Sequence, residues 1–210
     1  VAPLLKSPGI TLVQGKATFA GPHEVIVGEE HFSAPHIMIA TGSSAKKLPI
    51  PGADLPGVVT SREMLQLEQI PKRLCVIGGG VVGMEFASVF RSFGSEVSVV
   101  EYAKEILPSF DRDIAKRLRT ALKRKGITFN VGAAVTEISK VDEGYKVAFV
   151  SGNKEGEVEA DLVLMAVGRG PRLQHLGLDE IGVQYTSRGI VVDENMQTNI
   201  EGVYAIGDVN

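Results

Sequence analysis

A glycine-rich turn between two apolar runs is the feature that most constrains how this chain can fold. Residues 74–87 read LCVIGGGVVGMEFA, which is typical of a short strand, a turn and the start of a helix, and the next apolar run, SEVSVVE, ends at Glu101. The spaced glycines of the turn are Gly78, Gly80 and Gly83. In a dinucleotide site they would serve a tight turn, the approach of backbone to a pyrophosphate, and close packing of helix on strand. A helix that starts near Val81 would direct its unpaired N–H groups at that pyrophosphate.

Glu101 ends the second strand, about where a carboxylate would accept hydrogen bonds from both ribose hydroxyls of an adenosine. The same negative charge would repel the 2′-phosphate of NADP, and Lys104 is the only basic residue in 101–105. The sequence therefore predicts an NAD site. Two plainer interpretations stand beside it: the glycines could merely join strand to helix, and Glu101 could be an ordinary surface charge.

Length and charge leave room for one or two domains and exclude several classes of partner. The chain has 210 residues, 44% of them apolar, and a formal net charge of −3. This mixed, slightly acidic balance gives no reason to expect nucleic acid or an anionic membrane. No apolar run approaches the ~20 residues of a membrane helix, and no secretory signal opens the chain, so we expect the cytoplasm or an organelle matrix. No residue grouping suggests a metal site.

The single cysteine bears on redox chemistry. Cys75 lies inside the first apolar run, so we expect it to be buried and inert. With one cysteine, no disulfide can form within this chain.

The order of predicted elements indicates an α/β fold. From Gly57 to Gly170 strands and helices alternate, which implies a parallel sheet with helices on its faces. Three strands predicted within 135–160 form a β-meander. The segment 46–52, KKLPIPG, reads as a connection between domains. The predicted fold is therefore a Rossmann-like parallel sheet with a β-meander, accompanied by β-rich flanking segments that include strands near 10–19 and 24–27.

Helix signals are present at two further places. Ser61 could cap a short helix that must end by Pro71. A longer helix should begin near Asp111 and stop at Gly126. Its expected apolar face comprises Ile114, Leu118, Ala121 and Leu122.

Four separated segments together resemble one known family. They are IMIATGSS (37–44), VIGGGVVGMEFA (76–87), LVLMAVGRGPR (162–172) and TNIEGVYAIGDV (198–209). In order and spacing these segments resemble the pyridine-nucleotide–disulfide oxidoreductases, a flavoprotein family, over essentially the whole chain. Within the family, the segment after residue 94 and the last of the four are most similar to the dihydrolipoamide dehydrogenase branch.

The resemblance implies a domain division and two cofactors, NAD and FAD. It makes 49–170 an NAD-binding domain, flanked by two partial segments of an FAD-binding domain, 1–48 and 171–210. Family members also carry an earlier G-x-G-x-x-G, a redox Cys-x4-Cys pair and a C-terminal His-Glu pair, none of which is in this sequence. We therefore expect the middle of a longer enzyme, inactive on its own and with little bound flavin, whose flanking segments pair in a sheet with one uncovered face.

The resemblance also implies roles for individual residues. Asp208 would contact the ribityl chain of FAD, and Glu85 would pair with a lysine beside the flavin, as the one catalytic assignment. The plainer alternatives are turns at 41–42 and 168–169, and helix-end roles for Glu85 and Asp208. The full set of predicted cofactor contacts is Thr41, Gly42, Gly78, Gly79, Gly80, Val81, Val82, Gly83, Glu101, Gly168, Arg169 and Asp208.

The implied function is that of an FAD-dependent dihydrolipoyl dehydrogenase, which passes electrons from dihydrolipoamide through a disulfide and FAD to NAD+. The substrate would be a small molecule or a lipoyl domain, and the intact enzyme would be a homodimer. Other reductases of the family, namely mercuric reductase, a transhydrogenase or NADH oxidase, remain open. So does a nucleotide-binding module without catalysis.

Overall fold

The computed structural model describes residues 8–210, and the chain divides into two compact units. Unit 1 combines Val1–Ser44 with Gly170–Asn210, and unit 2 is Ala45–Arg169. The strands β5 (Ser43–Ala45) and β14 (Arg169–Pro171) pair where the chain passes from one unit to the other. No helix among the described residues is both long and apolar enough to cross a membrane.

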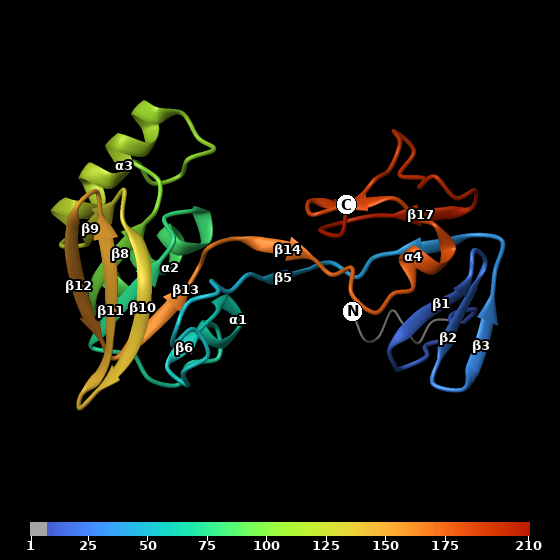
Figure 1. The fold of residues 1–210 in the computed structure, drawn as a ribbon, viewed down its shortest axis with the longest axis horizontal. Coiled ribbons are helices and arrows are strands. Elements are labelled where there is room, and N and C mark those ends of the chain that lie inside the picture. Colours follow the sequence, from blue (N-terminus) through green and yellow to red (C-terminus); the bar gives the residue numbers. More distant parts are fainter. Residues whose placement is uncertain (1–7) are drawn as a thin grey trace. The chain divides into compact units, whose positions relative to one another are not determined.

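Unit 2 is built on a five-stranded parallel sheet, as the sequence predicts (Figure 1). The strand order is β6-β13-β7-β8-β9, so the chain leaves β7 toward one side and later returns on the other. A reversal of this kind opens a crevice at the carboxyl ends of the strands. The strands are β6 (Val58–Val59), β7 (Arg73–Ile77), β8 (Glu96–Glu101), β9 (Thr128–Val131) and β13 (Leu162–Met165).

The helices of unit 2 begin and end close to the predicted signals. They are α1 (Ser61–Met64), α2 (Val81–Ser92) and α3 (Arg112–Arg124). The Asp111 carboxylate accepts hydrogen bonds from two N–H groups of the first turn of α3, which ends before Gly126. The cap of α1 differs from the prediction, because Thr60 rather than Ser61 forms a capping box with Glu63.

The buried face of α3 also differs from the prediction. Ala115, Leu118 and Leu122 pack into the core, whereas Ile114 is 55% exposed and Ala121 is exposed. The small side chain of Ala115 allows the helix to approach the sheet closely. The sequence pattern predicts Ile114 on the buried face because that pattern reflects apolar character alone.

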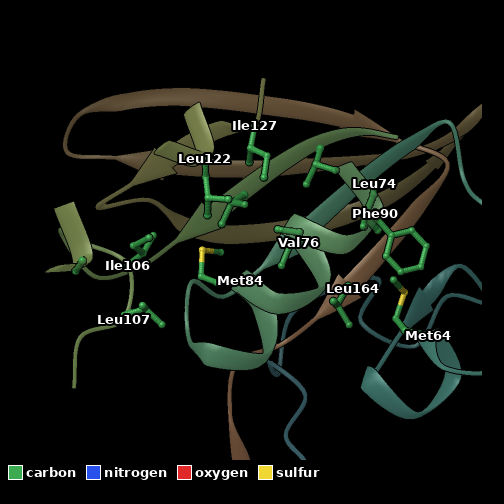
Figure 2. Close-up of a cluster of buried hydrophobic side chains, with 14 residues drawn as sticks. Met64, Leu74, Val76, Met84, Phe90, Ile106, Leu107, Leu122, Ile127 and Leu164 are labelled. Carbon is green, nitrogen blue, oxygen red and sulfur yellow. The ribbon is translucent and has the colours of Figure 1, made fainter. Parts of the chain in front are cut away.

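The two faces of the parallel sheet are covered by different structures, which corrects the expectation of helices on both. On one face, Met84 and Phe90 of α2 pack beside Val76 and Leu74 of β7 (Figure 2). Side chains of a strand alternate between faces, so Cys75 and Ile77 point into the other cluster. That cluster is closed by the antiparallel meander of β10 (Ala134–Val141), β11 (Gly144–Ser151) and β12 (Lys154–Ala160). The meander replaces a helix in the crossover from β9 to β13.

Unit 1 contains smaller sheets around its own core. The antiparallel sheet is formed by β1 (Ala17–Gly21), β2 (Glu24–Val27) and β3 (Glu30–Ser33). The strands β4 (Ile37–Ile39) and β17 (Val203–Ala205) pair in parallel, so the two flanking segments do pair as expected. The remaining elements are α4 (Leu178–Ile181), β15 (Tyr185–Thr186) and β16 (Gly189–Ile190).

The predicted first strand of unit 1 is only partly correct. Residues 10–16 form no strand, and β1 begins at Ala17. Ile10 and Leu12 are exposed. Apolar residues alone predicted the strand, but no described segment pairs with this stretch.

Candidate functional site

A cavity of about 520 Å³ lies at the carboxyl edge of the parallel sheet of unit 2. The ends of three neighbouring strands meet there: Ile77 ends β7, Glu101 ends β8 and Met165 ends β13. The cavity therefore occupies the place where open α/β sheets bind ligands. It is lined by Ala45, Leu48, Ser61, Ile77, Gly78, Gly80, Val81, Val82, Val100, Glu101, Tyr102, Pro108, Ala133, Ala134, Val135, Met165, Ala166, Val167, Gly168 and Arg169.

The three spaced glycines do three different things. Gly78 has φ +110°, and a Cβ atom there would overlap the carbonyl oxygen of Ala166. A Cβ atom at Gly83 would overlap the carbonyl oxygen of Gly78, so this glycine allows α2 to pack closely on the turn. At Gly80 a Cβ atom would meet nothing within 4 Å apart from its chain neighbours. Gly80 therefore keeps space open rather than relieving strain.

The start of α2 is suited to hold an anion. Gly80 is its N-cap, no side chain caps it, and no acidic residue lies in its first turn. The first N–H groups of a helix have no partner within the helix and carry the positive end of its dipole. Val81 and Val82 line the cavity at this point. A pyrophosphate placed over Gly80 would meet both the open space and these donors.

Glu101 is held in place by backbone donors. Its side chain accepts hydrogen bonds from the N–H groups of Gly79 and Ala103, the latter at 2.5 Å, and the residue is only 9% exposed. Each carboxylate oxygen thus accepts one bond. Because a carboxylate has about four acceptor positions, it can still accept ribose hydroxyls. The arrangement fits the adenosine ribose of a dinucleotide.

Gly79 joins the glycine turn to the segment that follows Glu101. Its N–H donates to Glu101, and its carbonyl oxygen accepts from the N–H of Leu107 at 2.8 Å. A Cβ atom at Gly79 would lie 3.1 Å from the buried Ile106 side chain, which is tighter than most packing contacts. Gly79 is not among the residues that line the cavity. Its structural role is therefore to bring Glu101 against the turn.

A forked ion pair anchors the segment that follows Glu101. Arg119 of α3 donates to Glu105 from Nε to Oε1 at 2.7 Å and from Nη2 to Oε2 at 2.9 Å. Burial alone would raise the pKa of the Glu105 carboxyl group. The hydrogen bonds from Arg119 and from the N–H of Ile106 outweigh it and hold that pKa below its usual value.

The second predicted turn of unit 2, Gly168-Arg169, also lines the cavity. Gly168 has φ +108°, and a Cβ atom there would meet nothing within 4 Å. Its carbonyl oxygen accepts a hydrogen bond from the N–H of Lys46 at 2.9 Å. The turn therefore needs a glycine for its backbone conformation.

In unit 1 the pairing of β4 with β17 brings two distant motifs together. Ile39 ends β4 and lies opposite Ala205, the end of β17, so residues 41–43 and 206–208 follow neighbouring strand ends. The hydroxyl of Ser43 donates to Asp208 Oδ2 at 2.7 Å. The hydroxyl of Thr41 donates to the carbonyl oxygen of Arg172 at 2.9 Å. A carboxylate beside hydroxyl groups at such an edge fits a polyhydroxylated chain such as ribityl.

Some predicted residues lie outside the cavity, and sequence reasoning missed others. Glu85 is exposed on α2 and does not line the cavity, so its catalytic role stays a prediction. Tyr102 and Pro108 were missed, although Tyr102 directly follows the predicted acid. Ala133–Val135 were also missed, because their place depends on where the meander starts and no local pattern shows that.

Cys75 is fully buried in the central strand, as predicted. Burial raises the pKa of its thiol to about 12. The thiol is therefore chemically inert at neutral pH. No cluster of His, Cys, Asp and Glu that could bind a metal occurs within residues 8–210.

The parallel sheet, the glycine turn and the acid at the end of β8 define a dinucleotide-binding class of fold. The family model for pyridine nucleotide-disulphide oxidoreductases matches residues 1–210. The chain therefore belongs to the pyridine nucleotide-disulphide oxidoreductase family, as the resemblance predicted.

Among curated relatives, dihydrolipoyl dehydrogenase from Acholeplasma laidlawii is 43% identical over all of this chain and 62% of its own length. The mitochondrial dihydrolipoyl dehydrogenase of Pisum sativum is 41% identical over 98% of this chain and 43% of its own length. The chain thus spans about half the length of the curated relatives it matches.

A solved structure is also similar. The HOCl-induced flavoprotein disulfide reductase RclA from Escherichia coli matches with a TM-score of 0.88 and 34% identity. The match covers 96% of this chain and 46% of the reductase. The α/β fold class is thereby confirmed.

Proposed function

We propose that the cavity of unit 2 binds NAD(H), with its pyrophosphate over Gly80 and the start of α2 and its adenosine ribose on Glu101. The observation that carries this proposal is the convergence of an uncapped helix start, an open Gly80 position and a buried carboxylate on one cavity. These groups supply donors for the phosphates and acceptors for the ribose hydroxyls.

The same groups support NAD rather than NADP. Glu101 is a buried carboxylate, so a 2′-phosphate placed beside it would be repelled. The residue that follows, Tyr102, is exposed, and its phenol offers no cation to such a phosphate.

We further propose that unit 1 contributes part of an FAD site, with Asp208 and the Thr41-Gly42 turn facing the ribityl chain. Support comes from the strand ends that bring 41–43 beside 206–208 and from the Ser43–Asp208 hydrogen bond. Flavin would supply two-electron transfer to the nicotinamide. The role of this chain would be to orient the two cofactors and to exclude water from the NAD pocket.

The activity that best fits is dihydrolipoyl dehydrogenase, in a longer protein that carries the cysteine pair. The relatives named above support it, at 41–43% identity. Its substrate would be dihydrolipoamide, free or on a lipoyl domain, and its working form a homodimer. Another flavoprotein disulfide reductase is the second candidate, supported by the similarity to the Escherichia coli reductase.

Calorimetric titration of the chain with NADH tests the nucleotide site directly. Binding should occur without added flavin, because every residue of the cavity lies within unit 2. The chain alone should not oxidise dihydrolipoamide, since Cys75, its one cysteine, is buried. It should not purify with stoichiometric flavin, because the earlier G-x-G-x-x-G that family members carry for the ADP part of FAD is not in this sequence. Turnover by this chain would contradict the proposal that the cysteine pair lies elsewhere.

A further inference from the structure

The segment between β8 and α3 is irregular but closely tied to the glycine turn. Leu107 has a positive φ of 50°, unusual for a residue with a side chain. Ile106 is fully buried, and the N–H of Leu107 donates to the carbonyl oxygen of Gly79. The position of this segment and the position of the turn are therefore linked.

The ion pair between Glu105 and Arg119 lies within this link. The Glu105 carboxylate accepts both forked bonds of Arg119 and also the N–H of Ile106 at 3.1 Å. The side chain of Glu105 is 16% exposed and that of Arg119 is 24% exposed. A partly buried pair of this kind gains little net stability, because desolvation offsets most of the attraction. The two parallel hydrogen bonds do fix the orientation of the Glu105 carboxylate relative to the Arg119 guanidinium, which a single charge contact would not.

Both ends of the segment meet at Gly79. Glu101 accepts the N–H of Gly79 at one end, and Leu107 donates to the carbonyl oxygen of Gly79 at the other. Ala103 is held as well, since its N–H donates to Glu101 and its carbonyl oxygen accepts from Gly132. A shift at residue 105 would therefore reach Glu101 through two short paths.

We propose that the Glu105–Arg119 pair is a positioning device for nucleotide binding, which holds residues 102–107 so that Glu101 is presented to the ribose. The inference rests on the proposed function and names residues beyond those that contact the ligand. Neither Glu105 nor Arg119 lines the cavity. Their effect on affinity would therefore act through Glu101.

The chain offers a matched control on the opposite edge of the sheet. Arg73, the first residue of β7, donates to Asp161 Oδ1 from Nε at 3.0 Å and from Nη2 at 2.7 Å. This pair also joins an arginine to a carboxylate in unit 2, although both of its side-chain bonds go to one oxygen and Arg73 pairs with Glu159 as well. It stands at the amino end of β7, whereas the glycine turn follows the carboxyl end.

The experiment compares Glu105→Gln, Arg119→Gln, the double variant and Asp161→Asn by NADH titration and thermal unfolding of the whole chain. Each of the first two should weaken NADH binding about fivefold, and the double variant no more than either single one, because the pair acts as a unit. Asp161→Asn should lower the melting temperature about as much as Glu105→Gln does. It should leave NADH affinity within about twofold of wild type.

A cycle with Glu101 separates positioning from general loosening. In the Glu101→Gln background, Glu105→Gln should cause no further loss of NADH affinity if it acts through that carboxylate. Equal losses of affinity in Glu105→Gln and Asp161→Asn would overturn the inference, as would unchanged affinity in Glu105→Gln. A wild-type chain that binds no NADH would instead refute the proposed function, and the inference with it.

Discussion

Each unit contains an apolar strand followed by a turn with candidate cofactor residues, but the strand is buried in unit 2 and partly exposed in unit 1. In unit 2 the strand before the glycine turn, β7, has neighbours on both sides and covered faces, and Cys75 and Val76 are fully buried. In unit 1 the corresponding apolar run, β4, pairs with β17, and its Met38 is 60% exposed. Both strands end beside candidate cofactor residues. The difference teaches that a motif at a strand end forms an enclosed site when its strand has neighbours on both sides and both faces of the sheet are covered.

Thiol labelling should show the largest contrast between the units. With a pKa of about 12, Cys75 should react with a thiol reagent at pH 8 about a thousandfold more slowly than an ordinary exposed cysteine of pKa ~8.5. A cysteine introduced by Met38→Cys in unit 1 should label at the ordinary rate, because that position is exposed. Rapid native-state labelling of Cys75 would show that unit 2 is not closed as described.

Gly80→Val should give the next largest effect, on binding rather than folding. The added side chain would occupy the space over the turn and cost about two charge-assisted hydrogen bonds to phosphate, or at least about 100-fold in NADH affinity. The backbone at Gly80 is extended, at φ −72° and ψ −177°, so valine fits it without strain. Normal NADH binding by this variant would place the nucleotide elsewhere.

Gly83→Ala should act on stability instead. A methyl group there would press on the carbonyl oxygen of Gly78, and overpacking of this kind costs about 1–3 kcal/mol in unfolding free energy. Gly80→Ala is the matched control and should change the unfolding free energy by less than about 1 kcal/mol, because its Cβ meets open space. Urea unfolding measures both, and equal losses would contradict the assigned division of roles.

Acid sensitivity of the Arg73–Asp161 pair should give the smallest effect. Burial raises the pKa of the Asp161 carboxyl group, but the hydrogen bonds from Arg73 outweigh it and lower that pKa below its usual value. A lowered pKa in the folded state means that the stabilisation is present above about pH 4 and is lost as the pH falls further. The side chain is 34% exposed, so the contribution is about 1 kcal/mol or less.

The variant Asp161→Asn tests whether the stabilisation by the Asp161 charge is lost as the pH falls. The variant should unfold at a lower urea concentration than the wild type at pH 7, and the gap should narrow as the pH falls below about 4. A gap that stays constant from pH 7 to pH 3 would mean that the Asp161 charge contributes nothing.

Local patterns predicted much of unit 2. The turn at 78–83, the start of α2 at Val81, the start of α3 near Asp111 and the burial of Cys75 each depend on a few neighbouring residues, and each was predicted from them. Glu101 was placed at the end of β8 because strand, turn, helix and strand follow one another at a fixed spacing. Its hydrogen bonds to Gly79 and Ala103 could not be predicted, because they depend on side-chain rotamers.

Features that depend on distant packing were not predicted. The meander covers a face that was assigned to helices, and it brings Ala133–Val135 to the cavity. The rotation of α3 that buries Ala115 rather than Ile114 depends on how closely the helix approaches the sheet. The Glu105–Arg119 pair joins a loop to a helix, and neither residue belongs to a recognisable motif.

The most direct test of the central claim is a calorimetric titration of the chain with NADH and with NADPH at equal ionic strength. NADH should bind at least about tenfold more tightly, because Glu101 would accept the ribose hydroxyls and repel a 2′-phosphate. Glu101→Arg should narrow or reverse that ratio, since it removes the acceptor and adds a phosphate partner. Equal affinities of the wild-type chain for the two cofactors, or no binding of either, would contradict the assignment of this cavity as an NAD site.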